Sequence, residues 1–367
     1  MKKDANTGVA LQAAISSVAD LYVGALNQGL SPSNLPPFML WGPPGVGKSQ
    51  GVRQIALDVG KRTGRKAVVT DVRLMLFNPV DLRGIPVANA ERTLAVWLKP
   101  EVFDMDADDG IVNVLFLDEI SAAPPSVQAT AYQITLDRRI GEHRLPDNCI
   151  VIAAGNRVTD RSVAYKMPKA LANRLCHIDV RADHRTWKAW AVRSGIDPRI
   201  LGFLEFQPDR LMRFDTATDD HAFATPRSWE MLSRVLDCLT GDDSGLFLLT
   251  SGCVGEGVAT EFLTWIDVYD SLPDIAAIFD GKDVEVPKST DALYALVSSM
   301  VAYARDNLDD EWRIERSIAY GTRLPVDYTV VLFRDYQSIS EQSKRLLMRS
   351  EALNDWSIAH GRFFNDI

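Results

Sequence analysis

Residues 42 to 49 read Gly-Pro-Pro-Gly-Val-Gly-Lys-Ser, directly after the short apolar run from Phe38 to Trp41. They match the pattern G-x-x-x-x-G-K-[ST], which cradles phosphate groups where it joins a strand to a helix. The glycines matter because the backbone must curl closely around the phosphates with its N–H groups pointing inward. The alternative is a Gly/Pro turn that ends in Lys-Ser by chance, but the apolar run before the turn and the helical pattern after it favour the phosphate loop.

This loop predicts a site for a nucleoside triphosphate. The Lys48 ammonium is expected to reach the β- and γ-phosphates, and the Ser49 hydroxyl is expected to bind Mg²⁺. A helix that starts near Lys48 would point the positive end of its dipole at the same anion. The nucleotide-binding residues that we predict here are Gly42, Pro43, Pro44, Gly45, Val46, Gly47, Lys48 and Ser49.

The length and composition of the chain limit the classes of protein to consider. A chain of 367 residues, of which 46% are hydrophobic, can bury two or three separate cores. The net charge of -9 argues against a generally basic nucleic-acid-binding protein, although a local basic channel would not show in that total. The cysteines form no C-x-x-C pair, so we expect reduced thiols and a cytoplasmic protein. No apolar stretch is long enough to span a bilayer, and we expect no membrane association.

Short apolar runs recur along the first half of the chain, with helical patterns between several of them. This alternation is typical of a three-layer αβα domain with a mainly parallel sheet, here of five strands. The predicted strands are residues 38–41, 67–74, 112–117, 149–154 and 175–180. From about residue 183, apolar residues recur at intervals of three and four, which predicts helices. The predicted divisions are 1–30 as an N-terminal helix packed on the core, 31–182 as the αβα core, 183–275 as a helical lid and 276–367 as a helical C-terminal extension.

Two consecutive carboxylates follow the predicted strand at 112–117. Asp118 and Glu119 would lie at the carboxyl end of a buried strand, where α/β sheets hold their ligands. Asp118 is expected to hold the Mg²⁺ that bridges the β- and γ-phosphates, and Glu119 to orient and deprotonate the attacking water. The alternative is that the two acids only cap the helix that follows. Their position behind a phosphate loop favours the catalytic interpretation.

Together with residues 150–157, Ile-Val-Ile-Ala-Ala-Gly-Asn-Arg, these motifs resemble those of AAA+ ATPases, and more narrowly those of the MoxR branch. The narrower resemblance depends on three further stretches: Asp-Leu-Arg-Gly-Ile-Pro-Val at 81–87, Leu-Asp-Arg-Arg-Ile-Gly-Glu-His at 136–143, and Ala-Leu-Ala-Asn-Arg-Leu at 170–175. The resemblance runs in chain order from about residue 30 to about residue 275, and the remainder of the chain matches only loosely.

The resemblance implies roles for three polar residues. Asn156 corresponds to the residue that hydrogen-bonds the attacking water or the γ-phosphate, although a Gly-Asn pair is also common in plain turns. Arg174 matches the arginine finger that acts in a neighbouring subunit's site, and Arg181 is a competing candidate. Arg227, next to Pro226 at a predicted helix start, resembles the arginine that reaches from the lid to the γ-phosphate. The predicted catalytic residues are Glu119, Asn156, Arg174 and Arg227.

Two charged hairpins are predicted between these motifs, at residues 84–97 and 138–145. In the resembled family the first insert faces the pore of a ring. The second contains four residues that can carry positive charge: Arg138, Arg139, His143 and Arg144. They could contact an acidic peptide, a nucleic-acid backbone or a neighbouring subunit. The alternative for both hairpins is a solvated connection between strands.

The resemblance implies ATP hydrolysis in a homo-oligomeric ring, expected to be a hexamer, because an arginine finger has no role in a monomer. ATPases of this branch remodel or mature a partner protein, often one with a von Willebrand factor A domain. Two alternatives stay open. A nucleic-acid-associated motor or loader is favoured by the basic hairpin and disfavoured by the acidic net charge. A nucleotide-gated scaffold has little need of Glu119 as a water-activating carboxylate.

Overall fold

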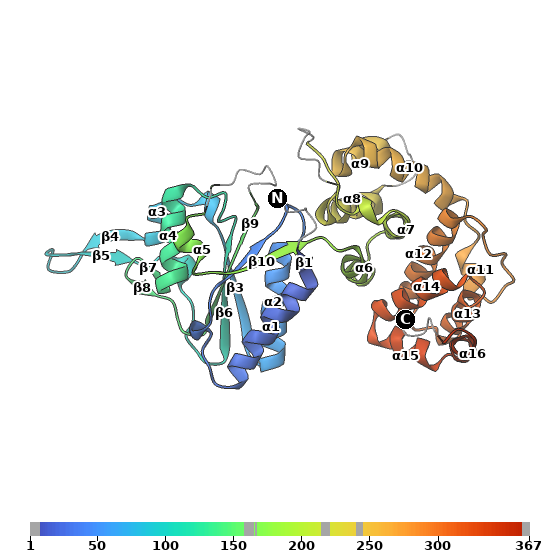
Figure 1. Cartoon of the computed structure of the whole chain (residues 1–367), viewed down its shortest axis with the longest axis horizontal. Coiled ribbons are helices and arrows are strands. Elements are labelled where there is room, and N and C mark those ends of the chain that lie inside the picture. The colour runs from blue at the N-terminus through green and yellow to red at the C-terminus, as the bar shows by residue number, and fades with distance from the viewer. Residues whose placement is uncertain (1–7, 158–164, 166, 214–220, 240–244, 362–367) are drawn as a thin grey trace. The chain divides into compact units, whose positions relative to one another are not determined.

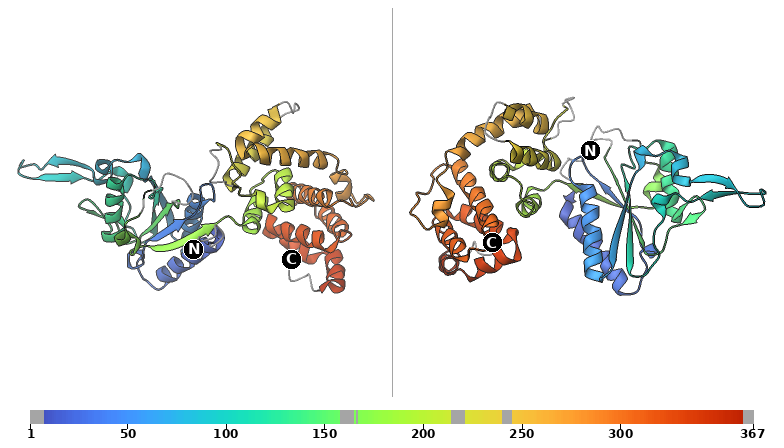
Figure 2. Two further views of the ribbon diagram at one scale, coloured as in Figure 1. Left: turned by 45° about the horizontal axis from the view of Figure 1, so that its top comes forward. Right: turned by 180° about the vertical axis from the view of Figure 1, so that it is seen from behind.

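The computed structural model describes residues 8–157, 165, 167–213, 221–239 and 245–361. The chain divides into two compact units, Met1–Ala182 and Asp183–Ile367 (Figure 1 and Figure 2). The first unit combines a central sheet with helices on both of its faces, and the second is helical.

The sheet of the first unit has six strands, and every neighbouring pair runs parallel. In spatial order the strands are β1 (Val9–Ala10), β10 (Cys176–Arg181), β2 (Phe38–Trp41), β9 (Cys149–Gly155), β6 (Ile111–Asp118) and β3 (Lys66–Arg73). The predicted αβα core and parallel sheet are confirmed, with one strand more than the five expected. The additional strand, β1, pairs with Val180 and Arg181, whereas its sequence resembles the start of the amphipathic helix that follows.

Helices cover both faces of this sheet (Figure 1). Along β6, Val114 and Phe116 pack into one layer with α1 and α2, whereas Leu115 and Leu117 pack into the opposite layer with α4. Alternate side chains of a strand point to opposite faces, so a strand buried on both faces appears as one unbroken apolar run. The helices of this unit are α1 (Leu11–Asn27), α2 (Lys48–Thr63), α3 (Pro79–Arg83), α4 (Pro125–Asp137) and α5 (Lys169–Ala172), with short 3₁₀ turns at Pro32–Asn34, Leu74–Leu76 and Glu101–Phe103.

Both predicted hairpins are present in the first unit. Strands β4 (Ile85–Ala88) and β5 (Ala95–Leu98) pair antiparallel and project away from the central sheet (Figure 1). Strands β7 (Arg139–Ile140) and β8 (His143–Arg144) form the second, shorter hairpin.

The second unit is built from helices, as the spacing of its apolar residues predicts. They are α6 (His184–Arg193), α7 (Pro198–Phe206), α8 (Pro226–Cys238), α9 (Leu246–Val254), α10 (Glu256–Asp270), α11 (Ile275–Phe279), α12 (Thr290–Asp306), α13 (Glu311–Gly321), α14 (Val326–Ile339), α15 (Glu341–Arg349) and α16 (Glu351–Ala359), with a 3₁₀ turn at Pro208–Arg210. Among the described residues, no helix is both long enough and apolar enough to cross a membrane.

Aromatic side chains fill part of the core of the second unit. The ring of Phe203 lies 5.6 Å from that of Trp229 and 5.3 Å from that of Phe262, measured between ring centroids. Helix α7 also packs on α12, and α6 on α14, so helices from both sides of residue 275 contact each other. The division that we predict at 275 and 276 therefore lies inside one compact unit and stays a prediction.

Candidate nucleotide-binding site

The predicted phosphate loop connects β2 to α2, which is the context that its sequence pattern requires. Gly45 and Gly47 adopt left-handed backbone conformations, with φ of 77° and 99°. Gly42 is restricted by space, because a Cβ atom there would lie 2.8 Å from both Cγ2 and the carbonyl oxygen of Val180. The local geometry of the loop therefore requires these glycines, in addition to the space that a bound phosphate is predicted to need.

Lys48 opens α2, and its side chain folds back over the loop. The residue is only 8% exposed, and its ammonium donates to the carbonyl oxygens of Gly42 at 2.7 Å and Pro43 at 3.0 Å. It also donates to Oδ1 of Asn156 at 2.9 Å. A buried cation is thus fixed at the centre of the loop, where it is little screened by solvent.

Ser49 and Asp118 form the second contact between the loop and the sheet. The Ser49 hydroxyl donates to Oδ2 of Asp118 at 2.9 Å. In an octahedral Mg²⁺ site with metal–oxygen distances of about 2.1 Å, two adjacent ligand oxygens lie about 3 Å apart. The separation of these two oxygens therefore fits the Mg²⁺ site predicted from the sequence. Among the described residues no group of three or more His, Cys, Asp or Glu side chains could hold a metal, so phosphate and water oxygens would complete the ligand set.

Glu119 follows in a strained turn at the end of β6. Its φ is 57°, a left-handed conformation that costs a non-glycine residue about 1 kcal/mol. The Glu119 N–H donates to Oδ1 of Asp118 at 2.9 Å, and the next N–H, of Ile120, donates to Ala154 at 3.0 Å. Within the described part of the chain, no hydrogen bond or ion pair engages the Glu119 carboxylate. The turn is fixed by the hydrogen bonds of its backbone.

Asn156 comes directly after β9, beside the ends of β2 and β6. Its N–H donates to Oγ of Ser121 at 3.0 Å, and Ser121 is buried. The preceding Gly155 has no room for a Cβ, which would lie 2.7 Å from the same Oγ. Ser121 therefore positions Asn156, a role that the sequence does not reveal because a serine two residues beyond Glu119 matches no motif.

The strand order explains why these residues meet. Strands β2, β9 and β6 are adjacent and parallel, so their carboxyl ends lie at one edge of the sheet. The contacts of Lys48 with Asn156 and of Ser49 with Asp118 join all three ends. Five predicted residues are brought together in this way: Lys48, Ser49, Asp118, Glu119 and Asn156.

The predicted arginines stand on other segments of the chain. Arg174 follows α5, is exposed, and forms no hydrogen bond or ion pair with a described residue. Its competitor Arg181 is half-buried on β10 and donates through Nε to the carbonyl oxygen of Gly8 at 3.0 Å. Arg227 is exposed in the first turn of α8, in the second unit. Thr225 caps that helix by accepting from the Ser228 N–H at 3.1 Å, and Pro226 occupies the first turn as predicted.

A pair of aromatic side chains links the loop to the segment that carries Arg174. The indole N–H of Trp41, directly before the loop, donates to Nδ1 of His177 at 2.8 Å. Because Nδ1 accepts, Nε2 of His177 carries the proton and donates to the carbonyl oxygen of Ala172 at 2.6 Å. Ala172 ends α5, two residues before Arg174. No sequence pattern indicates this link, since His177 stands in a run of mostly apolar residues that predicts a strand.

Residues 38–177 match the family model described as ATPase family associated with various cellular activities (AAA). The matched segment contains the five clustered residues and Arg174, whereas Arg227 and the second unit lie outside it. No curated protein matches the chain.

Several solved structures resemble the chain at low identity. A RuvB mutant from Thermotoga maritima is 16% identical over 80% of this chain and 84% of its own, with a TM-score of 0.38. NtrX from Brucella abortus in complex with ADP is 13% identical over 97% of this chain and 67% of its own, also with a TM-score of 0.38. PCH-2 from C. elegans is 15% identical over 71% of this chain and 62% of its own, with a TM-score of 0.32. All three TM-scores are below 0.5.

Proposed function

We propose that this chain is an AAA+ ATPase of the MoxR branch that hydrolyses ATP in a ring of identical subunits and remodels or matures a partner protein. The observation that supports hydrolysis best is the convergence of Lys48, Ser49, Asp118, Glu119 and Asn156 at the ends of three adjacent strands. A phosphate loop alone would bind nucleotide. A carboxylate and an amide beside it provide groups that act on water.

Each residue has a distinct part in the proposed reaction. The loop N–H groups and Lys48 bind the β- and γ-phosphates, and Lys48 neutralises charge that develops there. Ser49 and Asp118 would hold Mg²⁺, which supplies further positive charge to the phosphate oxygens. Asp118 already accepts from Ser49 and from the Glu119 N–H. Glu119, whose carboxylate is unengaged among the described residues, takes the proton from the attacking water, and the Asn156 amide orients that water.

Assembly is proposed from Arg174 and from the resemblance. An exposed arginine without a described partner has its N–H donors available for phosphate oxygens of a neighbouring subunit. Arg181 fits this role less well, because its guanidinium is half-buried and already donates to Gly8. Arg227 is proposed to reach the γ-phosphate from the helical unit of its own chain. A hexamer and a partner with a von Willebrand factor A domain rest on the resemblance alone, and the cytoplasm rests on the cysteine pattern of the sequence.

The nucleic-acid alternative depended on the basic hairpin formed by β7 and β8. Two of its four basic residues contact backbone atoms of the same unit. Arg138 donates to the carbonyl oxygen of Pro146 at 3.2 Å, and Nε2 of His143 lies 2.9 Å from the carbonyl oxygen of Trp97. Only Arg139 and Arg144 are exposed, as a cross-strand pair beside the exposed Glu142. The surface available to a phosphate backbone is therefore smaller than the sequence suggests, and protein remodelling is preferred.

The decisive experiment uses Glu119→Gln, which should bind ATP but hydrolyse it at least about 100-fold more slowly than the unaltered chain. Glu91→Gln, an exposed glutamate at the tip of the first hairpin, is the matched control and should keep full turnover. The Glu119→Gln chain, with Mg·ATP, is then used to capture partners from native lysate with and without nuclease.

The two outcomes separate the candidate functions. Recovery of a protein with a von Willebrand factor A domain, unaffected by nuclease, supports remodelling. Loss of the captured material on nuclease treatment supports the nucleic-acid motor. Unchanged turnover in Glu119→Gln would remove hydrolysis from the proposal and favour a nucleotide-gated scaffold.

A further inference from the structure

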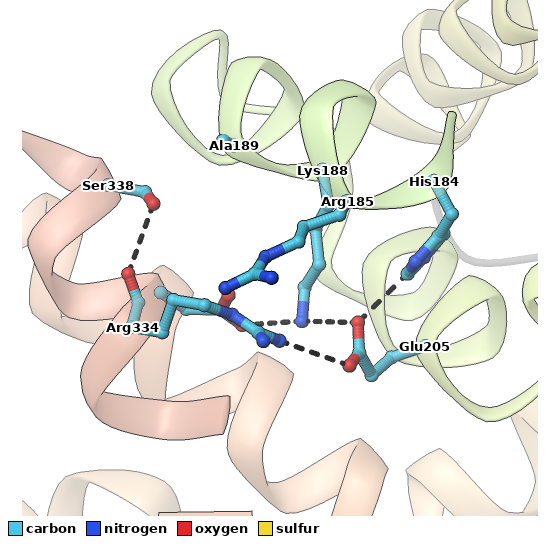
Figure 3. Close-up of a pocket in the computed structure, with 8 residues that line it drawn as sticks. His184, Arg185, Lys188, Ala189, Glu205, Arg334 and Ser338 are labelled. Carbon is cyan, nitrogen blue, oxygen red and sulfur yellow. Dashed lines mark hydrogen bonds and ion pairs between the residues drawn. The ribbon is translucent and has the colours of Figure 1, made fainter. Parts of the chain in front are cut away.

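Three helices of the second unit enclose a cavity of about 400 Å³ (Figure 3). Its charged lining comes from α6, α7 and α14: His184, Arg185, Lys188, Glu205, Arg334 and Asp335. None of these residues belongs to the candidate nucleotide site or to the motifs singled out in the sequence.

The deepest part of the cavity is a buried triad centred on Lys188. This residue is 4% exposed, and its ammonium lies 2.8 Å from Oε2 of Glu205 and 2.5 Å from Oδ2 of Asp335. Burial opposes the ionisation of Glu205, but the Lys188 ammonium, with His184 and Arg334, holds the pKa of that carboxyl below its usual range. The two carboxylates are therefore already occupied by a cation of the chain itself.

The outer part of the cavity has an excess of donors. Arg334 contacts Oε1 of Glu205 through one nitrogen at 3.5 Å, and a guanidinium group has five N–H donors in all. Arg185 is exposed and lines the same cavity, and within the described part of the chain no hydrogen bond or ion pair engages it. Figure 3 shows its guanidinium extending from α6 toward the side chains of α14. Three permanent cations thus face two carboxylates, which leaves a positive charge without a partner.

We propose that this cavity binds a small oxyanion, a phosphate or carboxylate group, between Arg185 and Arg334. The guanidinium groups of Arg185 and Arg334 line the same cavity, and their N–H donors suit the planar, paired oxygens of such an anion. The partly enclosed setting reduces screening by salt, and the volume is within the range of small-ligand pockets. The bound anion would join α6, which begins directly after Asp183, to α14 near the C-terminal end of the unit.

Binding is tested by titrating the full chain, saturated with Mg·ADP so that the phosphate loop is filled, with inorganic phosphate and separately with succinate. Isothermal titration calorimetry at matched ionic strength should show saturable binding of at least one of them. Phosphate alone would indicate a phosphate-bearing ligand, and succinate alone would indicate a carboxylate ligand. Arg185→Gln should weaken binding by at least about tenfold, because it removes a charge-assisted pair of hydrogen bonds.

Two further variants test whether the effect of Arg185→Gln is specific to the cavity. Arg193→Gln changes an exposed arginine on the same helix outside the cavity and should leave binding unchanged. Arg334→Lys keeps a positive charge beside Glu205 but removes the paired N–H donors of the guanidinium group, so it should also weaken binding. This result would hold even if Arg185→Gln proved too unstable to measure. Absence of saturable binding, or binding by both Arg185→Gln and Arg334→Lys that is as tight as binding by the unaltered chain, would overturn the proposal.

Discussion

The ammonium of Lys48 lies 2.9 Å from Oδ1 of Asn156, although the two residues are 108 positions apart in the chain. One stands at the start of α2 and the other at the end of β9, and the neighbouring strands β2 and β9 bring them together. A γ-phosphate held by Lys48 would therefore be within reach of the Asn156 amide. The pair defines the point in the site where phosphate chemistry is expected.

Lys48→Met should abolish most nucleotide affinity while leaving the fold intact. A hydrogen bond to a charged group is worth about 1.5–3 kcal/mol, so Kd for Mg·ATP should rise roughly 10- to 100-fold. Titration with a fluorescent ATP analogue measures this change. Lys61→Met, an exposed lysine in the last turn of the same helix, should bind as the unaltered chain does. Equal affinities for the two variants would remove Lys48 from the site.

Asn156→Ala should lower kcat by about 10- to 100-fold with a much smaller change in KM. The amide is expected to act on the attacking water in the transition state more than on bound ATP, and such interactions appear in kcat. Steady-state ATPase kinetics give both constants. An increase in KM at constant kcat would mean that Asn156 only holds Lys48 for ground-state binding.

Arg174→Ala should lower ATP turnover by about 1,000-fold if it is an arginine finger. The stronger test mixes Arg174→Ala with Glu119→Gln, two variants that are each inactive. In a mixed ring, Arg174 from the Glu119→Gln chain completes the intact site of its neighbour, and activity should return. Lys169→Ala, an exposed change on α5, should keep activity. Mixtures that stay inactive although mixed assembly is shown by mass photometry would contradict a role in trans.

The second unit should lose stability as the pH falls below about 6.5, the usual pKa of histidine. Burial, with the nearby Lys188 and Arg334 cations, lowers the pKa of His184, while Glu205 and Asp183 oppose that shift. Arg185 and Asp335 also line the cavity that His184 faces. In this window the unfolded chain binds more protons than the folded chain, so the free energy of unfolding decreases as the pH falls.

His184→Gln should therefore flatten the pH dependence of stability between about pH 6.5 and the lowered pKa of the folded state. Urea denaturation at pH values above and below this window gives the change in unfolding free energy. His221→Gln alters an exposed histidine of the same unit and should keep the slope of the unaltered chain. Parallel decreases in all three proteins would assign the effect to other groups.

The parts of the fold that could be predicted are those with local causes. Residues 149–155 are all buried, and their unbroken apolar sequence indicates a central strand directly. The phosphate loop and the capped start of α8 are likewise specified by neighbouring residues. For the site, the ends of β2, β6 and β9 could be placed together because parallel strands share an edge.

The remaining features depend on contacts between distant residues. β1 is a strand only because Val180 lies opposite Val9, and a two-residue strand leaves no periodic pattern. Ser121 accepts a hydrogen bond from the backbone N–H of Asn156, and His177 accepts one from the indole of Trp41. No spacing of residues in the sequence indicates either contact. The sequence predicts Arg138 as a charged hairpin residue available to a partner, whereas its side chain turns inward to backbone carbonyl oxygens.

The left-handed backbone of Glu119 has a practical consequence for engineering. Glycine tolerates a φ of 57° without steric cost, so Glu119→Gly should relieve about 1 kcal/mol of strain and give a chain at least as resistant to heat. The same substitution deletes the carboxylate on which turnover is proposed to depend. In a library of variants sorted by thermal tolerance, Glu119→Gly would therefore rank near the top. In the same library sorted by ATP consumption, it would rank near the bottom.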